Sequence, residues 1–578
     1  MEINIMVAGE AGQGVQSVGF LLAQVLARSG YHVFADQDYE SRIRGGHNFF
    51  RVRAGDSRVG AISQSLDILI ALNEESIRIH SREVRKEGKI VFDEERVKSG
   101  VPKSKSFGTP LEKIAVETTG KKIAANTVAL AAALGIVGAD FELLEGVLRE
   151  RFKSGEVADE NVKAARQGYD HALEKGAGKF PVAFGKRRGR WKRKMLINGN
   201  EAIAMGALAA GCKFISAYPM TPATTILEFL TERADEFGLV AVQPEDEIAA
   251  INMAVGAGYA GLRAMTATSG SGFCLMVEGL GWAGITETPI VVVDAQRPGP
   301  AVGLPTRTEQ ADLQFALHAH HGDFPRVVIA PSNAENAFWL TVKAFNIAER
   351  YQLPVILLTD HYLASSYTTV EPYDTSRVHI DRGELYMGAP PGKPAEYQRH
   401  RITRTGISPR ALPGRSEALV ITDSDEHDET GHLTEDAKAR TGQVEKRLRK
   451  LEGLRKEISG PPVYGSKGLE VLLVGWGSSE GPIKEAVDML QSGGMSVNMM
   501  QLTELWPFPA RSVAEALEAA RYSYVVEGNA SGQMARLIKA ETGRNVTGRI
   551  LRYDGRPLTP EYIAGAIEKE VSGNGPKS

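Results

Sequence analysis

Cysteine is nearly absent from the sequence. Only Cys212 and Cys274 occur among 578 residues. A disulfide framework needs a larger set, and an iron–sulfur cluster usually needs four cysteine ligands. Any iron–sulfur chemistry linked to this chain must therefore lie on another subunit.

Long apolar runs and a large net charge are also missing. No stretch approaches the roughly 20 apolar residues that span a bilayer, and Met1–Ala8 enters a strand-like pattern in place of a secretion signal. The formal net charge of -3 gives no attraction to nucleic acid or to membrane surfaces. We expect a cytoplasmic protein whose partners are other proteins and small polar or anionic ligands.

The length and the pattern of the chain predict several domains. Short apolar strands alternate with amphipathic helices in three stretches, which predicts three doubly wound, mostly parallel α/β domains. We expect these domains over residues 1–185, 198–370 and 467–570, with a basic linker at 186–197 and a connector at 371–466. The connector contains one predicted helix, whose apolar residues at helical spacing are Val444, Leu448, Leu451, Leu454 and Ile458.

The most specific pattern is Tyr218-Pro-Met-Thr-Pro222, which follows a predicted strand that ends at Ala217. The two prolines fix φ on both sides of Thr221, so its hydroxyl is held at the carboxyl end of a strand, where open α/β sheets bind ligands. In the other interpretation, Thr221 only caps the helix predicted over 223–234. The pattern alone does not separate the two.

Three further motifs follow in the second domain. Glu245-Asp-Glu247 stands at the start of an alanine-rich helix, where acids often only complement the helix dipole. The segment 266–272 is rich in glycine and hydroxyl groups, which predicts a pocket lined by backbone. Arg297 and Arg307 follow the next strand, and either can bind a carboxylate with two hydrogen bonds.

These motifs, in this order, resemble the α subunit of 2-oxoacid:ferredoxin oxidoreductases. The resemblance is carried by segments 218–222, 245–257, 266–272, 277–284, 294–300 and 303–313. Residues 1–175 are similar to the γ region of the family, here fused ahead of the α region, and 505–533 is similar to its transketolase C-terminal-like domain. One departure is Met220, where the family usually has isoleucine.

The resemblance implies roles for particular residues. In the family the motif threonine, here Thr221, contacts the 2-oxoacid, and the arginine best matched by Arg297 binds its carboxylate, with Arg307 as the weaker match. A glutamate at the head of the helix reaches N1′ of the thiamine aminopyrimidine, and an ungapped register selects Glu247 over Glu245. The other residues expected at the cofactor are Tyr218, Pro219, Ser269 and Gly270.

The N-terminal glycine loop suggests a second binding region. Backbone amides at a helix N-terminus attract phosphate, so Gly12 and Gly14, with Arg42 and Arg44, are candidates for the cleft of coenzyme A. In the other interpretation, the glycines only allow close helix–strand packing and the arginines only meet the next domain.

One part of the family's machinery is missing from this chain. A thiamine enzyme needs an acidic Gly-Asp-Gly loop that holds Mg²⁺ against the diphosphate, and neither Asp140 nor Asp554 has that context. The resemblance therefore implies a β subunit that supplies the diphosphate site, Mg²⁺ and a 4Fe-4S cluster, in a heterodimer that reduces ferredoxin. We expect no metal site in this chain.

The implied reaction is the thiamine-diphosphate- and coenzyme-A-dependent oxidative decarboxylation of a 2-oxoacid. The γ–α fusion favours 2-oxoglutarate, then pyruvate, then branched-chain 2-oxoacids. A stand-alone transketolase-like enzyme would need the missing diphosphate loop, and a regulatory or binding subunit without catalysis would not need Thr221, Glu247 and Arg297 together.

Overall fold

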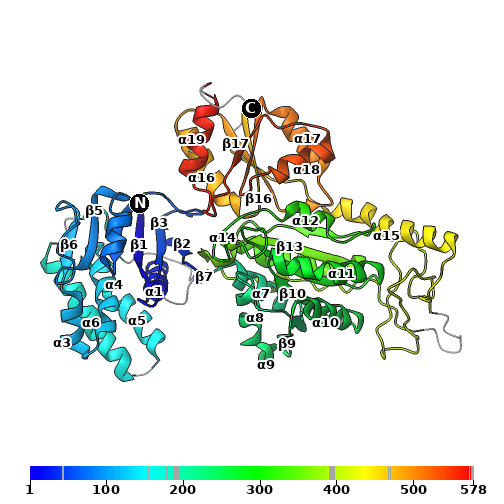
Figure 1. Cartoon of the computed structure of the whole chain (residues 1–578), viewed down its shortest axis with the longest axis horizontal. Helices are drawn as coiled ribbons and strands as arrows, with labels where there is room; N and C mark the ends of the chain where they lie inside the picture. The colour runs from blue at the N-terminus through cyan, green and yellow to red at the C-terminus, as the bar shows by residue number, and fades with distance from the viewer. Residues whose placement is uncertain are drawn as a thin grey trace. The chain divides into compact units, whose positions relative to one another are not determined.

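The computed structural model describes residues 1–41, 45–153, 155–176, 180–185, 194–388, 397–465, 468, 470–571 and 573. The chain forms two compact units (Figure 1). The first contains Met1–Asn198, Ser365–Tyr373 and Thr559–Tyr562. The second contains Gly199–Ala364, Asp374–Leu558 and Ile563–Ser578.

The first unit is built on an eight-stranded mixed sheet, in the order β6-β5-β4-β1-β3-β2-β14-β7. β1 pairs in parallel with β4 and antiparallel with β3. The last two strands of the sheet come from residues that flank the first segment of the second unit, Gly199–Ala364. The strands are β1 (Glu2–Glu10), β2 (His32–Asp38), β3 (His47–Gly55), β4 (Leu66–Ala71), β5 (Val84–Asp93), β6 (Ser106–Thr109), β7 (Met195–Ile197) and β14 (Tyr367–Val370).

The core of the first unit includes a helix, α4 (Ala125–Ile136), that is buried along most of its length. It packs closely on α6 (Gly155–Glu174) because Gly168 has no side chain; a Cβ there would lie 2.6 Å from the Val128 carbonyl oxygen. The remaining helices are α1 (Val15–Arg28), α2 (Glu74–His80), α3 (Leu111–Thr119) and α5 (Phe141–Phe152).

The second unit contains a seven-stranded sheet in the order β18-β12-β13-β11-β10-β8-β9, parallel except for β18. Because the central strands β10, β11, β12 and β13 are short and buried, the middle of the sheet lies in the core, and its parallel strands end at one edge. The strands are β8 (Phe214–Ser216), β9 (Val240–Val242), β10 (Ala264–Thr268), β11 (Ile290–Gln296), β12 (Val327–Ile329), β13 (Pro354–Asp360) and β18 (Glu504–Trp506).

Two helices of this sheet pack together through glycine. α10 (Glu247–Tyr259) and α11 (Gly270–Ile285) approach closely at Gly279, where a Cβ would lie 2.6 Å from Ile251 Cγ2. The other helices are α7 (Gly199–Ala209), α8 (Thr224–Thr231), α9 (Ala234–Phe237), α12 (Leu313–His318), α13 (Ala334–Tyr351) and α14 (His361–Ser365).

The third sheet also belongs to the second unit and has the order β15-β17-β16-β19-β20. Trp476 and Met500 from this sheet share a hydrophobic core with Val292 and Ile356 of the seven-stranded sheet. Its elements are β15 (Val463–Gly465), β16 (Val471–Trp476), β17 (Val497–Leu502), β19 (Tyr522–Glu527), β20 (Gly548–Leu551), α16 (Glu480–Ser492), α17 (Ala510–Ala519), α18 (Gln533–Thr542) and α19 (Pro560–Val571).

The predicted three α/β sheets are confirmed, with two of them mostly parallel and the first one mixed. The domain boundaries given above stay predictions. None of the described helices combines the length and the apolar character needed to cross a membrane.

The connector helix α15 (Ala437–Glu457) is attached by charged groups. Among its predicted apolar positions, only Leu454 is buried. The other buried residues are polar: Gln443, Lys446, Arg447 and Lys450. The helical spacing predicted the helix correctly, but the face that packs is mainly the polar one.

Glu287 is the partner of the two buried lysines. Its carboxylate pairs with Lys446, with Lys450 at 2.5 Å and with His400 Nδ1 at 2.9 Å, and all four side chains are fully buried. Burial alone would raise its pKa, but the two lysine charges hold the pKa of Glu287 well below its ordinary value. Burial lowers the pKa of Lys446 to about 7 and that of Lys450 to about 8, against the attraction of Glu287.

This cluster leads to a stability prediction. Glu287→Gln leaves two buried ammonium groups without their anion, so we expect the free energy of unfolding in urea to fall by about 3–5 kcal/mol. Lys446→Met is the matched control, because replacing one charge by an apolar side chain of similar size leaves the Glu287–Lys450 pair intact. A larger loss for Lys446→Met than for Glu287→Gln would contradict this assignment.

Candidate active site

The candidate site lies where β8, β10 and β11 end. The loop Tyr218–Pro222 follows β8, the turn at Ser269 and Gly270 follows β10, and Arg297 follows β11. Since carboxyl ends of parallel strands share one edge, these loops are neighbours. Two contacts join them: Arg297 Nη1 donates to the Thr221 carbonyl at 2.7 Å, and Ser271 Oγ donates to Met220 Sδ at 3.5 Å.

Thr221 does not cap the helix that follows it. α8 begins at Thr224, and its N-cap is Ala223, which makes no side-chain cap hydrogen bond. The cap interpretation of the motif is therefore wrong. Tyr218, on the same loop, is 38% exposed, and Pro219 is half-buried.

Three consecutive acids at the start of α10 have different surroundings. Glu245 is exposed, and Asp246 is the N-cap, whose side chain accepts a hydrogen bond from the Ala249 amide at 2.8 Å. Glu247 is only 3% exposed, and its Oε1 is buried without a hydrogen-bond partner among the described residues. Burial raises the pKa of Glu247, and the charge of Asp246 acts in the same direction.

Because Gly272 has no side chain, this carboxyl group approaches the first turn of α11 closely. A Cβ at Gly272 would overlap Thr268 Oγ1 and lie 2.5 Å from Glu247 Oε1. Glu247 Oε1 and Thr268 Oγ1 therefore both lie against the first turn of α11 at Gly272. Such a buried oxygen needs a proton donor to satisfy it.

The turn before α11 carries a second unsatisfied group. Ser269 is the N-cap of α11 but its side chain makes no cap hydrogen bond, and its buried Oγ has no partner in the described chain. At Gly270 a Cβ would lie 2.7 Å from Asp312 Oδ2. The sequence did not indicate Asp312 as a neighbour of this turn.

Both arginines act on one buried histidine. Arg297 is 8% exposed, and burial lowers the pKa of its guanidinium. The stem of Arg307 packs on Gly555, and its Nη1 donates to the Thr306 carbonyl at 3.4 Å. Burial, followed by the positive charges of Arg307 and Arg297, lowers the pKa of His361 to about 4.

Sequence reasoning missed His361. A signal was present, because His361 follows the predicted strand 354–359 much as Arg297 follows its own strand. Its position at the start of α14 places it at the same sheet edge.

The glycine loop of the first unit is held by side chains around it. Gly12 and Gly14 have φ of 90° and 77°, a conformation that favours glycine. Gln13 Oε1 accepts from the Glu10 amide at 2.7 Å, and Asn126 Nδ2 donates to the Gln13 carbonyl at 2.6 Å. Arg42 and Arg44 lie outside the described residues, so the coenzyme A assignment stays a prediction.

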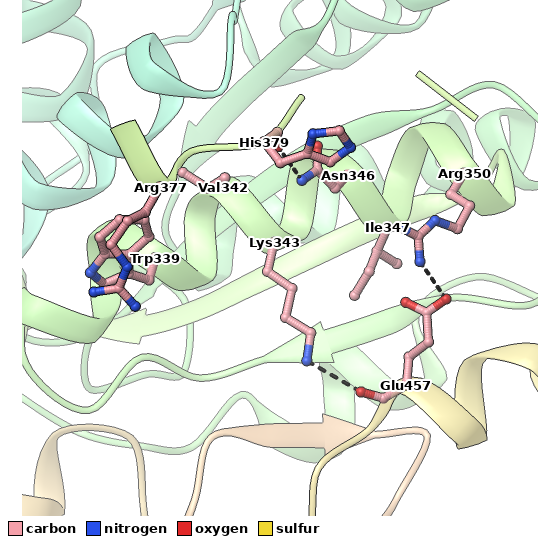
Figure 2. Close-up of a pocket in the computed structure, with 9 residues that line it drawn as sticks. All are labelled: Trp339, Val342, Lys343, Asn346, Ile347, Arg350, Arg377, His379 and Glu457. Carbon is pink, nitrogen blue, oxygen red and sulfur yellow. Dashed lines mark hydrogen bonds and ion pairs between the residues drawn. The ribbon is translucent and has the colours of Figure 1, made fainter. Parts of the chain in front are cut away.

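A separate cavity of about 240 Å³ lies beside α13 (Figure 2). Its basic groups are already engaged: Lys343 pairs with Glu504, Arg350 pairs with Asp381 and Glu457, and Arg377 lies over the Trp339 ring. The cavity is therefore not a strong candidate for a further anion.

The helices that carry the site have an apolar outer side. α10 contains no charged residue after Glu247, and it exposes Ile248 and Met253 by 47% and 43%. Leu275 on α11 is 48% exposed. An uncovered apolar surface beside a buried site is typical of a protein interface.

Three family profiles match the chain in succession. Residues 4–171 match "Pyruvate ferredoxin/flavodoxin oxidoreductase", residues 205–446 match "Pyruvate flavodoxin/ferredoxin oxidoreductase, thiamine diP-bdg", and residues 470–563 match "Pyruvate:ferredoxin oxidoreductase core domain II". Each of these three ranges contains most of the strands of one sheet.

Full-length relatives carry the same three parts. The 2-oxoacid:ferredoxin oxidoreductase subunit alpha of Saccharolobus solfataricus is 34% identical, covering 99% of this chain and 98% of the relative. The corresponding subunit of a Sulfolobus species is 32% identical, covering 99% and 97%. The chain belongs to the 2-oxoacid:ferredoxin oxidoreductases, as an α subunit with an N-terminal γ-like domain.

Two further relatives of this α subunit have names that mention 2-oxoglutarate. The 2-oxoglutarate synthase subunit KorA of Archaeoglobus fulgidus is 36% identical over 65% of this chain and 99% of the relative. A solved 2-oxoglutarate:ferredoxin oxidoreductase from Magnetococcus marinus, with 2-oxoglutarate, coenzyme A and succinyl-CoA bound, is 32% identical with a TM-score of 0.92, covering 99% of both chains.

The close approach of Glu247 to Gly272 gives a test of whether the cofactor of this 2-oxoacid:ferredoxin oxidoreductase binds beside Glu247. Gly272→Ala places a methyl group against Thr268 and Glu247, and we expect the affinity for thiamine diphosphate, measured by calorimetry on the assembled enzyme, to fall by roughly 10²-fold. Gly146→Ala is the control, because a Cβ at Gly146 in α5 meets nothing within 4 Å. Equal affinities for both variants would show that the pyrimidine does not bind here.

Proposed function

We propose that this α subunit supplies half of an active site that decarboxylates a 2-oxoacid oxidatively and transfers its acyl group to coenzyme A. The observation that carries the proposal is Glu247, a buried carboxyl group whose Oε1 has no hydrogen-bond partner among the described residues and lies close to Gly272 in the first turn of α11. A group that binds there must bring a hydrogen-bonding atom to this oxygen. The N1′ atom of an aminopyrimidine meets that requirement.

Thiamine diphosphate, when bound, supplies the nucleophilic carbon that attacks the 2-oxo carbon of the substrate. We assign to Glu247 the hydrogen bond to N1′, and its raised pKa favours the protonated form that this hydrogen bond needs. We also assign Ser269, Gly270, Tyr218 and Pro219 to the cofactor, because they follow β10 and β8 at the same edge of the sheet.

Thr221 and Arg297 are assigned to the substrate carboxylate. Arg297 is held by the Thr221 carbonyl through Nη1, which fixes the direction of its guanidinium group. A fixed cation beside a threonine hydroxyl can hold a carboxylate in one orientation for attack at the adjacent carbon.

Arg307 supports 2-oxoglutarate as the substrate. We assign Arg307 to the second carboxylate of 2-oxoglutarate, a group that pyruvate lacks, since Arg307 and Arg297 both lower the pKa of the same residue, His361. The KorA relatives and the solved 2-oxoglutarate enzyme support the same choice. Pyruvate and branched-chain 2-oxoacids are the alternatives, in that order.

The other half of the site is assigned to a β subunit. The apolar outer side of α10 and α11 borders Glu247, so a subunit that docks there would cover the site and bring the diphosphate and Mg²⁺ binding groups with a 4Fe-4S cluster. Ferredoxin then receives the electrons. We place this assembly in the cytoplasm, with coenzyme A as co-substrate beside the Gly12–Gly14 loop.

The role of Glu247 can be measured apart from turnover. Glu247→Gln keeps the shape of the side chain but removes its ionisable proton, so exchange of the thiamine C2 proton should slow by about 10²–10⁴-fold. Glu245→Gln is the matched control and should exchange at the parental rate because Glu245 is exposed. A parental rate in Glu247→Gln would end the assignment.

Variants of Arg297 and Arg307 should distinguish recognition of the carboxylate that all 2-oxoacids share from recognition of the second carboxylate of 2-oxoglutarate. With the β subunit present and a viologen as acceptor, Arg297→Ala should lower kcat/KM by about 10²–10⁴-fold for every 2-oxoacid, which corresponds to about 3–5 kcal/mol, because the common carboxylate loses its cation. Arg307→Ala should lower kcat/KM for 2-oxoglutarate and leave that for pyruvate nearly unchanged. The α subunit alone should be inactive and colourless.

A uniform loss in Arg307→Ala, with Arg297→Ala selective for 2-oxoglutarate, would exchange the two roles. Turnover by the isolated α subunit would contradict the division of the site between two subunits.

A further inference from the structure

The loop that carries Arg307 is held by the third sheet, and the site described so far gives this contact no role. The strands β16, β19 and β20 are parallel, so their carboxyl ends meet at one edge of that sheet. Open α/β sheets bind ligands at such an edge. In this chain the edge is occupied by residues 307–311, which contact the residues that end or follow all three strands.

Gln310 is the centre of this contact. It is buried, and its amide donates to the Gly528 carbonyl at 2.6 Å, while its carbonyl accepts from Asn529 Nδ2 at 2.9 Å. Its side-chain Nε2 donates to the Trp476 carbonyl at 3.0 Å, and its Oε1 accepts from the Gly528 amide at 2.9 Å. Because the backbone and the side chain of Gln310 are both bound, this residue cannot move without leaving buried polar groups unpaired.

The third sheet is shaped to receive this glutamine. Gly477 has a φ of 54°, and a Cβ there would lie 2.9 Å from Gln310 Nε2. Asn529 is held in turn, since its Nδ2 also donates to Glu527 Oε2 at 2.7 Å and both residues are buried. The partners of Gln310 are therefore fixed within the third sheet, and the segment around Asn529 does more than form a turn.

The same loop carries Arg307 at a short distance along the chain from Gln310. The Thr308 amide donates to the Gly555 carbonyl at 3.3 Å, and a Cβ on Gly555 would lie 3.1 Å from Arg307 Cβ. The backbone of this loop is thus bound to the third sheet at Gly555 and again at Gln310. Since the backbone is fixed on both sides, the third sheet sets the point from which the Arg307 side chain extends.

A second glutamine joins the same two sheets without holding the Arg307 loop. Gln314 of α12 donates from Nε2 to the Gln533 carbonyl at 3.2 Å, and its amide donates to Gln533 Oε1 at 2.9 Å. These bonds attach α12 to the start of α18. Gln314 is therefore a matched comparison for Gln310, because it has the same side chain and contacts the same sheet.

We propose that Gln310 is a positioning residue, through which the third sheet holds Arg307 in the orientation that recognises the second carboxylate of the 2-oxoacid. The third sheet then takes part in substrate selection through Arg307. The effect on selection rests on the proposed function of Arg307, whereas the fixed loop is a property of the α subunit itself.

The first measurement is hydrogen–deuterium exchange of the amides of residues 303–309 in the assembled enzyme without substrate. Gln310→Met keeps the length of the side chain but removes both of its hydrogen bonds, so these amides should exchange at least about tenfold faster than in the parental enzyme. Gln314→Met is the control and should leave their exchange unchanged. Parental exchange in Gln310→Met would overturn the positioning role, whatever the substrate is.

The second measurement compares kcat and KM for 2-oxoglutarate and for pyruvate, with a viologen as acceptor. In Gln310→Met the KM for 2-oxoglutarate should rise by about tenfold, while kcat and the KM for pyruvate stay near their parental values. A general loss of structure would not discriminate between the two substrates. Gln314→Met should leave the constants for both substrates near the parental values.

The Arg307→Ala background tests whether Gln310 acts through Arg307. In that background Gln310→Met should change kcat/KM for 2-oxoglutarate by no more than about twofold, because the interaction that Gln310 positions is already lost. Losses that add in the double variant would refute the coupling. Should Arg307→Ala itself fail to discriminate between the substrates, the assignment of Arg307 falls, and the exchange measurement still decides whether Gln310 holds the loop.

Gln310→Glu is a milder variant that keeps the test open if Gln310→Met does not fold. It retains an acceptor for the Gly528 amide and replaces the donor to the Trp476 carbonyl. We expect the same selective rise in the KM for 2-oxoglutarate, smaller than in Gln310→Met. Equal effects of the Gln310 and Gln314 variants in both measurements would reduce the contact to attachment of the two sheets and end the proposal.

Discussion

A carboxyl group removed from water must find a cation, a hydrogen-bond donor or a proton, and this constraint organises the second unit. Glu287 finds cations, because α15 brings Lys446 and Lys450 to it. Glu247, Asp294 and Asp312 find none in the described chain, and their oxygens lie unsatisfied around the first turn of α11. The chemistry of the site follows from that difference.

The buried carboxyl groups of the second unit thus fall into a structural group around Glu287 and a group around α11 that we assign to function. The charge of Glu287 is compensated by ion pairs within the chain, so its cluster attaches the connector helix and has no need of a ligand. The carboxyl groups around α11 are satisfied only when something is added, whether a proton or an aminopyrimidine. Their burial costs stability, and such unsatisfied groups are more often found at functional sites than elsewhere.

Much of this could be predicted from local sequence. Strands such as β10 and β11 are short apolar runs with glycine or proline nearby, and the residues that end them, Ser269 and Arg297, follow at fixed offsets. The three-sheet architecture and the converging loops were therefore accessible. The choice of Glu247 over Glu245 came from an ungapped register with the family. The difference in burial between these two acids appears only in the structure.

The remaining features depend on residues that are distant in sequence. Nothing near Tyr367–Val370 indicates that β14 joins the first sheet, and the amphipathic spacing of α15 indicates the wrong face. Asp312 and His361 also lacked a local signal strong enough to place them, since their partners come from other loops. Periodicity describes one element at a time, whereas these contacts require the assembled sheet.

One strand has a consequence for how this protein can be divided. β18 comes from the C-terminal part of the chain, yet it pairs antiparallel with β12 at the margin of the seven-stranded sheet. It satisfies the hydrogen-bonding groups that β12 would otherwise present to solvent. A fragment that stops before β16 would lack β18 and would expose the edge of β12, which could then pair with another copy of the fragment. The second and third sheets should therefore be expressed together.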